Sequence, residues 1–135
     1  MCYVLFMRLF LIILGWINTV FLAYKHLSGD DSCLVNQSCN DVILSEFGTF
    51  LGVPVAVFGL VYYTMLLYLR LQNQLNKNNL SLVENVFIII GVVVSTVLMI
   101  IQFSVLRSFC IYCTLSASII YGLAILTLYQ RRLSR

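Results

Sequence analysis

Charged side chains are scarce in this sequence, with 8 Lys and Arg and 5 Asp and Glu among 135 residues, or 10%. Soluble domains carry about 25% charged residues. Hydrophobic residues make up 61% of the chain and the mean hydropathy is +1.00. A soluble fold could not bury this much apolar surface, so we exclude one. The length suits a single membrane domain, which we predict over residues 1–135.

The sequence also lacks a cluster of basic residues. Its net charge is +3, yet Lys and Arg do not gather in one stripe or arm with aromatic residues between them. Such gathering is typical of nucleic-acid-binding surfaces, so we predict no nucleic-acid partner. Internal repeats and low-complexity tracts are absent as well. The apolar stretches contain almost no charged residue, which argues against a transporter.

Four apolar stretches are present, at residues 9–24, 53–71, 86–106 and 109–129. Each is long enough, or nearly so, to cross about 30 Å of hydrocarbon as a helix. They predict an all-α integral membrane protein with a bundle of four transmembrane helices. The first stretch is the shortest. It follows Arg8 in the manner of a secretory signal, so cleavage after it stays an alternative.

The basic residues predict the orientation of the bundle. With four crossings both termini share one side, and six of the eight basic residues lie on it: Arg8, Arg70, Lys77, Arg131, Arg132 and Arg135. Lys25 and Arg107 lie on the other side. Cytoplasmic segments carry the excess of Lys and Arg, so both termini are predicted to be cytoplasmic and the long 25–52 loop extracytoplasmic.

The second half of that loop, NDVILSEFGTFL, spaces its apolar residues with a helical period. We predict a short amphipathic helix that lies on the bundle. Asn40 or Asp41 can cap its start, and Gly48 and Gly52 can form a bend before Pro54, in the first turn of the second span. An irregular turn is the alternative for so short a segment.

Two cysteine pairs carry the functional signal. Cys110 and Cys113 begin the fourth stretch, just after Ser108, a candidate N-cap. The amide groups at a helix start stabilise a thiolate, and one helical turn brings two such sulfurs within reach of each other. Cys33 and Cys39 lie in the outer loop on the same side of the membrane. Two pairs on one oxidising face can exchange disulfides.

Other interpretations of these cysteines stay open. Cys33 and Cys39 could form a purely structural disulfide. All four could bind zinc with His26, although the spacing of Cys33 and Cys39 is wider than zinc sites usually use, and we predict no metal site. A lone histidine just outside a span is more often an interfacial residue. Cys2 lies at the other end of the bundle and is predicted to be incidental.

The motifs together resemble a known family. They are CNDVILS at 39–45, FGTFLGVP at 47–54, FGLVYY at 58–63 and FCIYCTLSA at 109–117. The sequence resembles the quinone-linked vitamin K epoxide reductases and, more closely, their bacterial homologues that drive disulfide formation. The unrelated periplasmic thiol oxidase with four spans has its two pairs in the reverse order.

The resemblance implies a role for each cysteine. Cys113 faces the quinone and forms the redox centre with Cys110, while Cys33 takes electrons from a partner and Cys39 relays them to Cys110. Ser45 matches the family's hydrogen-bonding serine or threonine near that centre, and the amphipathic segment matches its short helix. The aromatic residues that could line the quinone pocket are Phe58, Tyr62, Tyr63 and Tyr112, although buried aromatics usually serve core packing.

The predicted function is therefore that of a thiol:quinone oxidoreductase in the bacterial inner membrane. Electrons pass from an extracytoplasmic thioredoxin-fold thiol oxidase, expected to be a separate protein, to a quinone of the ubiquinone, menaquinone or phylloquinone class. Reduction of vitamin K or its epoxide is an alternative, although the vertebrate Asn and Tyr that hold vitamin K correspond to Val55 and Ala117. A non-catalytic membrane protein with structural disulfides is a second alternative.

Overall fold

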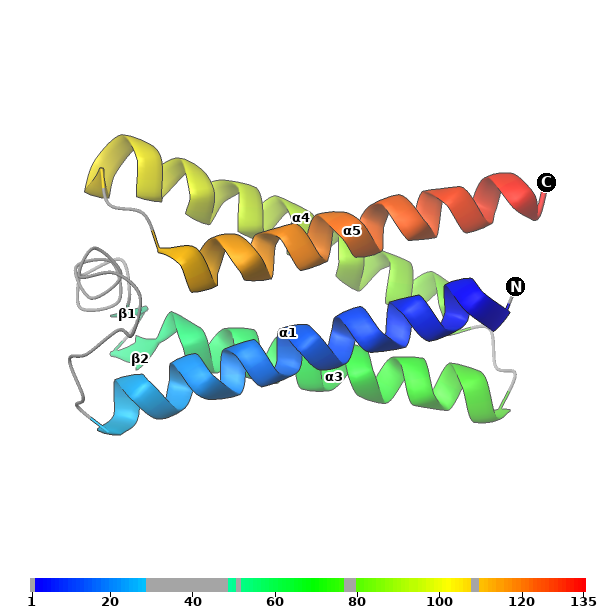
Figure 1. Cartoon of the computed structure of the whole chain (residues 1–135), viewed down its shortest axis with the longest axis horizontal. Coiled ribbons are helices and arrows are strands. Elements are labelled where there is room, and N and C mark those ends of the chain that lie inside the picture. Colours follow the sequence, from blue (N-terminus) through cyan, green and yellow to red (C-terminus); the bar gives the residue numbers. More distant parts are fainter. Residues whose placement is uncertain (1, 29–48, 51, 77–79, 108–109) are drawn as a thin grey trace.

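The computed structural model describes residues 2–28, 49–50, 52–76, 80–107 and 110–135. In these ranges four long helices make up most of the structure: α1 (Cys2–Ser28), α3 (Val55–Asn76), α4 (Ser81–Ile101) and α5 (Ile111–Leu133) (Figure 1). A π-helix, η1 (Gln102–Leu106), continues α4. All four helices are long and apolar enough to span a membrane. The predicted all-α membrane bundle is confirmed.

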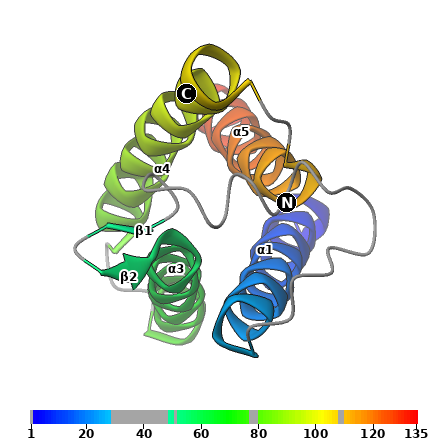
Figure 2. The same ribbon diagram turned by 90° about the vertical axis from the view of Figure 1, so that its left-hand side faces the viewer.

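The helices form a ring when viewed from one end of the bundle (Figure 2). In ring order α1 is followed by α3, α4 and α5, and α5 packs back against α1. The two chain termini lie at one end. The end of α1, the start of α3 and the start of α5 lie at the other (Figure 1). The described part of α1 therefore ends, and α3 begins, at the end of the bundle where Cys110 lies.

The outer surface of the bundle is apolar, as a lipid-facing surface must be. Its exposed side chains include Phe10, Ile89, Val93 and Ile125, one or more from α1, α4 and α5. Inside, apolar side chains of all four helices form one core: Ile12, Tyr63, Leu66, Ile88, Ile119, Ile120 and Leu123. In lipid the helices gain little from hiding apolar surface, so close packing inside the ring must hold them together.

Two tyrosines achieve this close packing against glycines. The ring of Tyr63 on α3 covers Gly15 on α1, and the hydroxyl of Tyr62 reaches Gly91 on α4, so that a Cβ on either glycine would overlap the ring or hydroxyl. The Tyr62 hydroxyl donates to the Phe87 carbonyl at 2.8 Å. Both tyrosines thus act as packing residues between helices.

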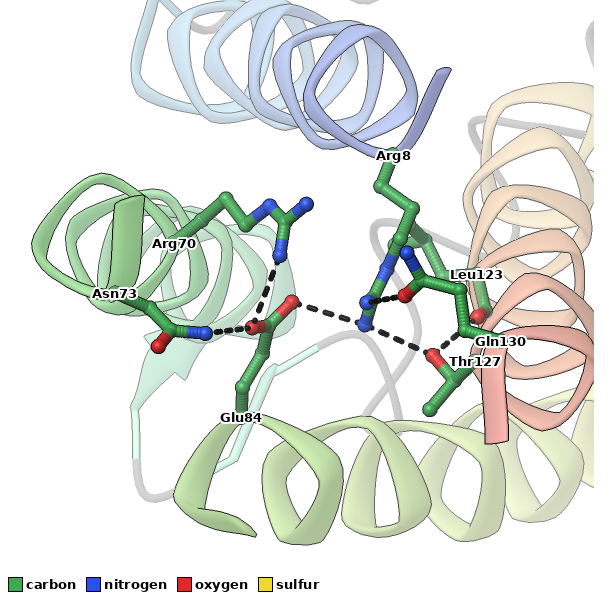
Figure 3. A network of polar contacts seen from close by, with 7 residues as sticks. All are labelled: Arg8, Arg70, Asn73, Glu84, Leu123, Thr127 and Gln130. Atoms are coloured by element: carbon green, nitrogen blue, oxygen red, sulfur yellow. Dashed lines mark hydrogen bonds and ion pairs between the residues drawn. The ribbon is translucent and has the colours of Figure 1, made fainter. Parts of the chain in front are cut away.

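A buried polar network joins all four helices near the termini (Figure 3). Glu84 on α4 lies between Arg8 of α1, whose Nη2 is 3.0 Å from Oε1, and Arg70 of α3, whose Nη1 is 3.4 Å from Oε2. Arg8 Nη2 also donates to the Thr127 hydroxyl on α5 at 2.9 Å. Asn73 donates to Glu84 and Gln130 accepts from Arg8. One carboxylate therefore faces two buried guanidinium groups.

This network explains why the first helix is longer than its apolar stretch. The apolar stretch covers residues 9–24, whereas α1 is the longest of the four described helices, at 27 residues. Arg8 lies directly before that stretch. Its side chain is only 6% exposed and is neutralised inside the bundle by Glu84, so the helix continues past it to Cys2.

A small hairpin precedes α3. Strand β1 (Thr49–Phe50) pairs antiparallel with β2 (Val53–Pro54), and Gly52 occupies the left-handed region with φ of 80°. The bend predicted at Gly52 is therefore present. Thr49 and Phe50, predicted to end the amphipathic helix, form a strand, and the rest of that prediction lies outside the described residues. Pro54 precedes the first turn of α3.

Candidate redox site

Cys110 and Cys113 lie at the start of α5. Cys110 is the N-cap, with extended backbone (φ −96°, ψ 113°), and is fully buried. Its carbonyl accepts the Thr114 amide at 3.1 Å and the Thr114 hydroxyl at 2.9 Å. Cys113 lies in the first helical turn and is half-buried. The helix therefore begins at Ile111 and is capped by a cysteine, two residues later than predicted, while Ser108 lies outside the described residues.

Arg107 sets the direction of the chain between η1 and α5. It ends the π-helix in the left-handed conformation, with φ of 45° and ψ of 26°. Among the described residues other than glycine, it is alone in having a positive φ. This conformation is uncommon for a residue with a Cβ. The π-helix thus ends in a left-handed residue, three positions before Cys110.

Cys113 lines a cavity inside the ring of helices. Its volume is about 140 Å³ and its walls are mostly apolar. A closed apolar cavity of about 150 Å³ in another protein holds a benzene molecule, so this space suits one aromatic ring. All four helices and η1 contribute to the lining: Asn18, Thr19, Leu22, His26, Val55, Ala56, Gly59, Ser95, Leu98, Met99, Ile101, Gln102, Tyr112, Cys113, Ser116 and Ala117.

Two contacts from α1 hold the start of α5 beside the cavity. Asn18 Nδ2 donates to the carbonyl of Tyr112 at 3.0 Å. The rings of Phe21 and Tyr112 pack at a tilt, with centroids 5.5 Å apart. Each contact involves the residue directly before Cys113. The position of that sulfur relative to the cavity therefore depends on α1 as well as on α5.

The predicted site residues fall into three groups. Tyr112 and Cys113 line the cavity, and buried Cys110 lies one turn away. Phe58 and Tyr62 are not among the lining residues, since Phe58 is 47% exposed and Tyr62 packs against α4. Cys33, Cys39 and Ser45 lie outside the described residues. Val55 and Ala117, the positions of the vertebrate Asn and Tyr, both line the cavity and are apolar.

Several polar residues of the cavity were not predicted. Asn18, Ser95 and Gln102 interrupt otherwise apolar stretches of sequence, and polar residues inside a membrane span are a recognised signal of function. His26, considered as a zinc ligand or an interfacial residue, also contributes to the lining. In the described part of the chain no three His, Cys, Asp or Glu side chains come together. The zinc alternative depends on Cys33 and Cys39.

A helical membrane bundle that holds a Cys-x-x-Cys pair beside an apolar cavity is the architecture of a membrane-embedded thiol oxidoreductase. The sequence matches the model of the Vitamin K epoxide reductase family over residues 6–128. The chain therefore belongs to the vitamin K epoxide reductase family. The match extends from the first turns of α1 to near the end of α5 and so includes the whole cavity.

Proposed function

We propose that this protein is a thiol:quinone oxidoreductase that supports disulfide formation outside the cytoplasm. The observation that carries the proposal is the position of Cys113 in the wall of an apolar, ring-sized cavity, next to buried Cys110. A quinone head group is flat and apolar apart from its two oxygens, and concave apolar pockets with few polar groups bind such ligands. When bound, the quinone accepts two electrons.

The cysteine pair at the start of α5 gives these electrons. The Cys110 and Cys113 dithiol becomes a disulfide, and two electrons and two protons pass to the quinone, which leaves as the quinol. The amide groups in the first turn of α5 favour the thiolate form of a sulfur close to them. The apolar walls exclude water, which strengthens the effect of each nearby dipole.

Cys33 and Cys39 then restore the dithiol. Cys39 as a thiolate attacks the Cys110 sulfur, and attack by Cys33 on the resulting mixed disulfide returns the Cys110 and Cys113 dithiol and leaves Cys33 and Cys39 oxidised. A separate thioredoxin-fold dithiol protein reduces this disulfide through Cys33 and becomes oxidised itself. Ser45 is proposed to donate a hydrogen bond near the redox centre. Each exchange conserves electrons, because one disulfide is broken for each one formed.

The cysteine end of the bundle is proposed to face away from the cytoplasm, in a bacterial inner membrane. Arg131, Arg132 and Arg135 lie at the opposite end, with both termini. An excess of basic residues at the termini favours their retention on the cytoplasmic side. Disulfides persist on the outer side, where the cell does not keep thiols reduced.

Turnover by the purified protein tests this function. The full chain in detergent is mixed with a reduced thioredoxin-fold thiol oxidase and a short-chain naphthoquinone, and quinol formation is followed by absorbance. We expect Cys113→Ala to reduce the rate to that of the mixture without enzyme. Cys2→Ala is the matched control, because Cys2 is exposed at the other end of the molecule, and should leave the rate unchanged.

A second variant tests the route of the electrons. In Cys39→Ala mixed with the oxidised partner, the Cys33 thiolate should attack the partner's disulfide and form a mixed disulfide that Cys39 can no longer resolve and that survives non-reducing gel electrophoresis. Turnover that persists in Cys113→Ala would contradict the proposed redox centre. Wild-type protein that oxidises no thiol in the presence of any quinone would instead favour structural disulfides.

A further inference from the structure

Most polar side chains in the cavity wall already have partners within the protein. Asn18 holds the Tyr112 carbonyl. The Thr19 hydroxyl is 3.0 Å from the Gly15 carbonyl and 2.9 Å from that of Trp16. The Ser116 hydroxyl lies 3.2 Å from the Tyr63 hydroxyl. These groups hold helices in place, and a ligand in the cavity could engage them only by competing with those contacts.

Gln102 is different. The residue is only 4% exposed, and its Oε1 is buried without any hydrogen-bond partner in the ranges that the structure describes. A buried acceptor left unpaired destabilises the fold, because it has lost its hydrogen bonds to water without gaining others. His26 Nε2 is also buried and unpaired there, but that residue as a whole is only half-buried, in the last turn of α1. Among the polar side chains of the cavity wall that have an atom without a hydrogen-bond partner in the described ranges, Gln102 is therefore the most deeply buried.

The backbone around Gln102 is arranged to bring this side chain into the wall. Gln102 is the first residue of the π-helix η1. Its backbone N–H donates to the carbonyls of both Leu98 and Met99, which line the same cavity. Short π-helical turns within α-helices occur often at functional sites, because the wider turn redirects a side chain. An unpaired buried amide oxygen and an irregular helix thus coincide at one residue.

We propose that Gln102 binds a ring oxygen of the quinone held beside Cys113. This inference rests on the proposed function. A carboxamide suits both redox states of the ring: its Nε2 donates to the carbonyl of the quinone, and its Oε1 accepts from the hydroxyl of the quinol. Because Val55 and Ala117 offer no polar side-chain atom, Gln102 supplies a polar contact that those two positions do not.

Replacement of Gln102 by methionine tests the inference, since methionine has a similar length and no amide. If Gln102 binds quinone and also destabilises the protein without quinone, its replacement should affect the unfolding temperature differently in the two conditions. Without quinone, Gln102→Met should unfold at the same temperature as wild type or higher, because an unpaired buried oxygen has been removed. With a short-chain naphthoquinone, its thermal stabilisation should be smaller than that of wild type.

The kinetics give a second readout. We expect the KM for the naphthoquinone to rise about tenfold with little change in kcat, as for the loss of one hydrogen bond made equally in the ground and transition states. Gln74→Met, at an exposed position on α3, is the matched control and should change neither quantity.

The outcomes separate this inference from the proposed function. If wild type neither binds nor reduces the naphthoquinone, the proposed function fails. If wild type does both and Gln102→Met has the same KM and the same thermal stabilisation, only the role of Gln102 is overturned. A Gln102→Met protein that unfolds at a lower temperature without quinone would show a structural role for the amide and would also overturn the inference.

Discussion

Glu84 is the only acidic side chain in the described part of the chain, and it faces two buried arginines. A change at this one residue therefore affects the electrostatic environment of both arginines. The Glu84 side chain is 2% exposed. Burial of a charge is tolerated only when an opposite charge and hydrogen bonds compensate for the lost water. Here one carboxylate compensates for both Arg8 and Arg70, so the two guanidinium groups depend on the same partner.

We therefore predict that Glu84→Gln strongly destabilises the protein. Loss of the shared carboxylate leaves two uncompensated positive charges inside the bundle, and breaking a buried ion pair from one side typically costs about 3–5 kcal/mol. The thermal unfolding midpoint in detergent should fall, and the fall should be measured against wild type at the same detergent concentration.

A triple variant provides the control for this prediction. Arg8→Met, Arg70→Met and Glu84→Leu together remove all three charges and keep similar volumes, and such replacements are often neutral or stabilising. The triple variant should therefore be far more stable than Glu84→Gln. Equal stability of Glu84→Gln and wild type would contradict the importance of the network.

Sequence reasoning could not find this network. The basic residues at the ends of apolar stretches are ordinarily topology signals, and Arg8 was interpreted in that way. Its burial depends on Glu84, which lies far along the chain and just before the third apolar stretch. Only the ring arrangement, in which α1 and α4 lie across the bundle from each other, brings the two side chains together inside it. Cys110 and Cys113, in contrast, could be predicted because their spacing is local.

At the scale of helices, the contact between α1 and α3 depends on Gly15. The ring of Tyr63 occupies the space where a side chain at Gly15 would lie. Gly122 on α5 offers a contrast, because a Cβ there would meet Leu11 at an ordinary distance of 3.7 Å. Two glycines in helices of the same bundle thus differ in how much space surrounds them.

We predict that Gly15→Ala destabilises the protein by about 1–3 kcal/mol, as expected for overpacking of a close contact. Gly122→Ala should be neutral or slightly stabilising, since alanine favours a helix over glycine by about 1 kcal/mol. Thermal unfolding of both variants provides the comparison. Tyr63→Leu in the Gly15→Ala background should restore part of the loss. Similar stabilities for the two alanine variants would argue against the close contact.

The element boundaries show where sequence patterns are informative. Hydropathy found all four long helices, because lipid demands long uninterrupted apolar segments. It could not find the hairpin before α3 or the start of α5 at Ile111. These depend on backbone angles, φ of 80° at Gly52 and an extended Cys110, and apolar spacing carries no information about either.

At the scale of the whole molecule, the orientation in the membrane can be tested with Cys2. This residue is exposed at the terminal end of the bundle. In a variant that keeps Cys2 and has Ala at the other four cysteine positions, a membrane-impermeant maleimide should label permeabilised spheroplasts and leave intact ones unlabelled. Ser28→Cys in a variant without the five native cysteines is the control, since Ser28 is exposed at the opposite end.

The expected pattern for Ser28→Cys is the reverse, with labelling of intact spheroplasts. Labelling of Cys2 in intact spheroplasts would show that the termini face outward. The cysteine end would then face the reducing cytoplasm, where disulfide formation is disfavoured.

The π-helix η1 also has a consequence for the comparison of related sequences. A π-turn contains about one residue more than an α-turn, so Gln102–Leu106 acts as a one-residue insertion in the third span. A relative without it would show a single-residue gap between 102 and 106 and would turn another side chain toward the cavity.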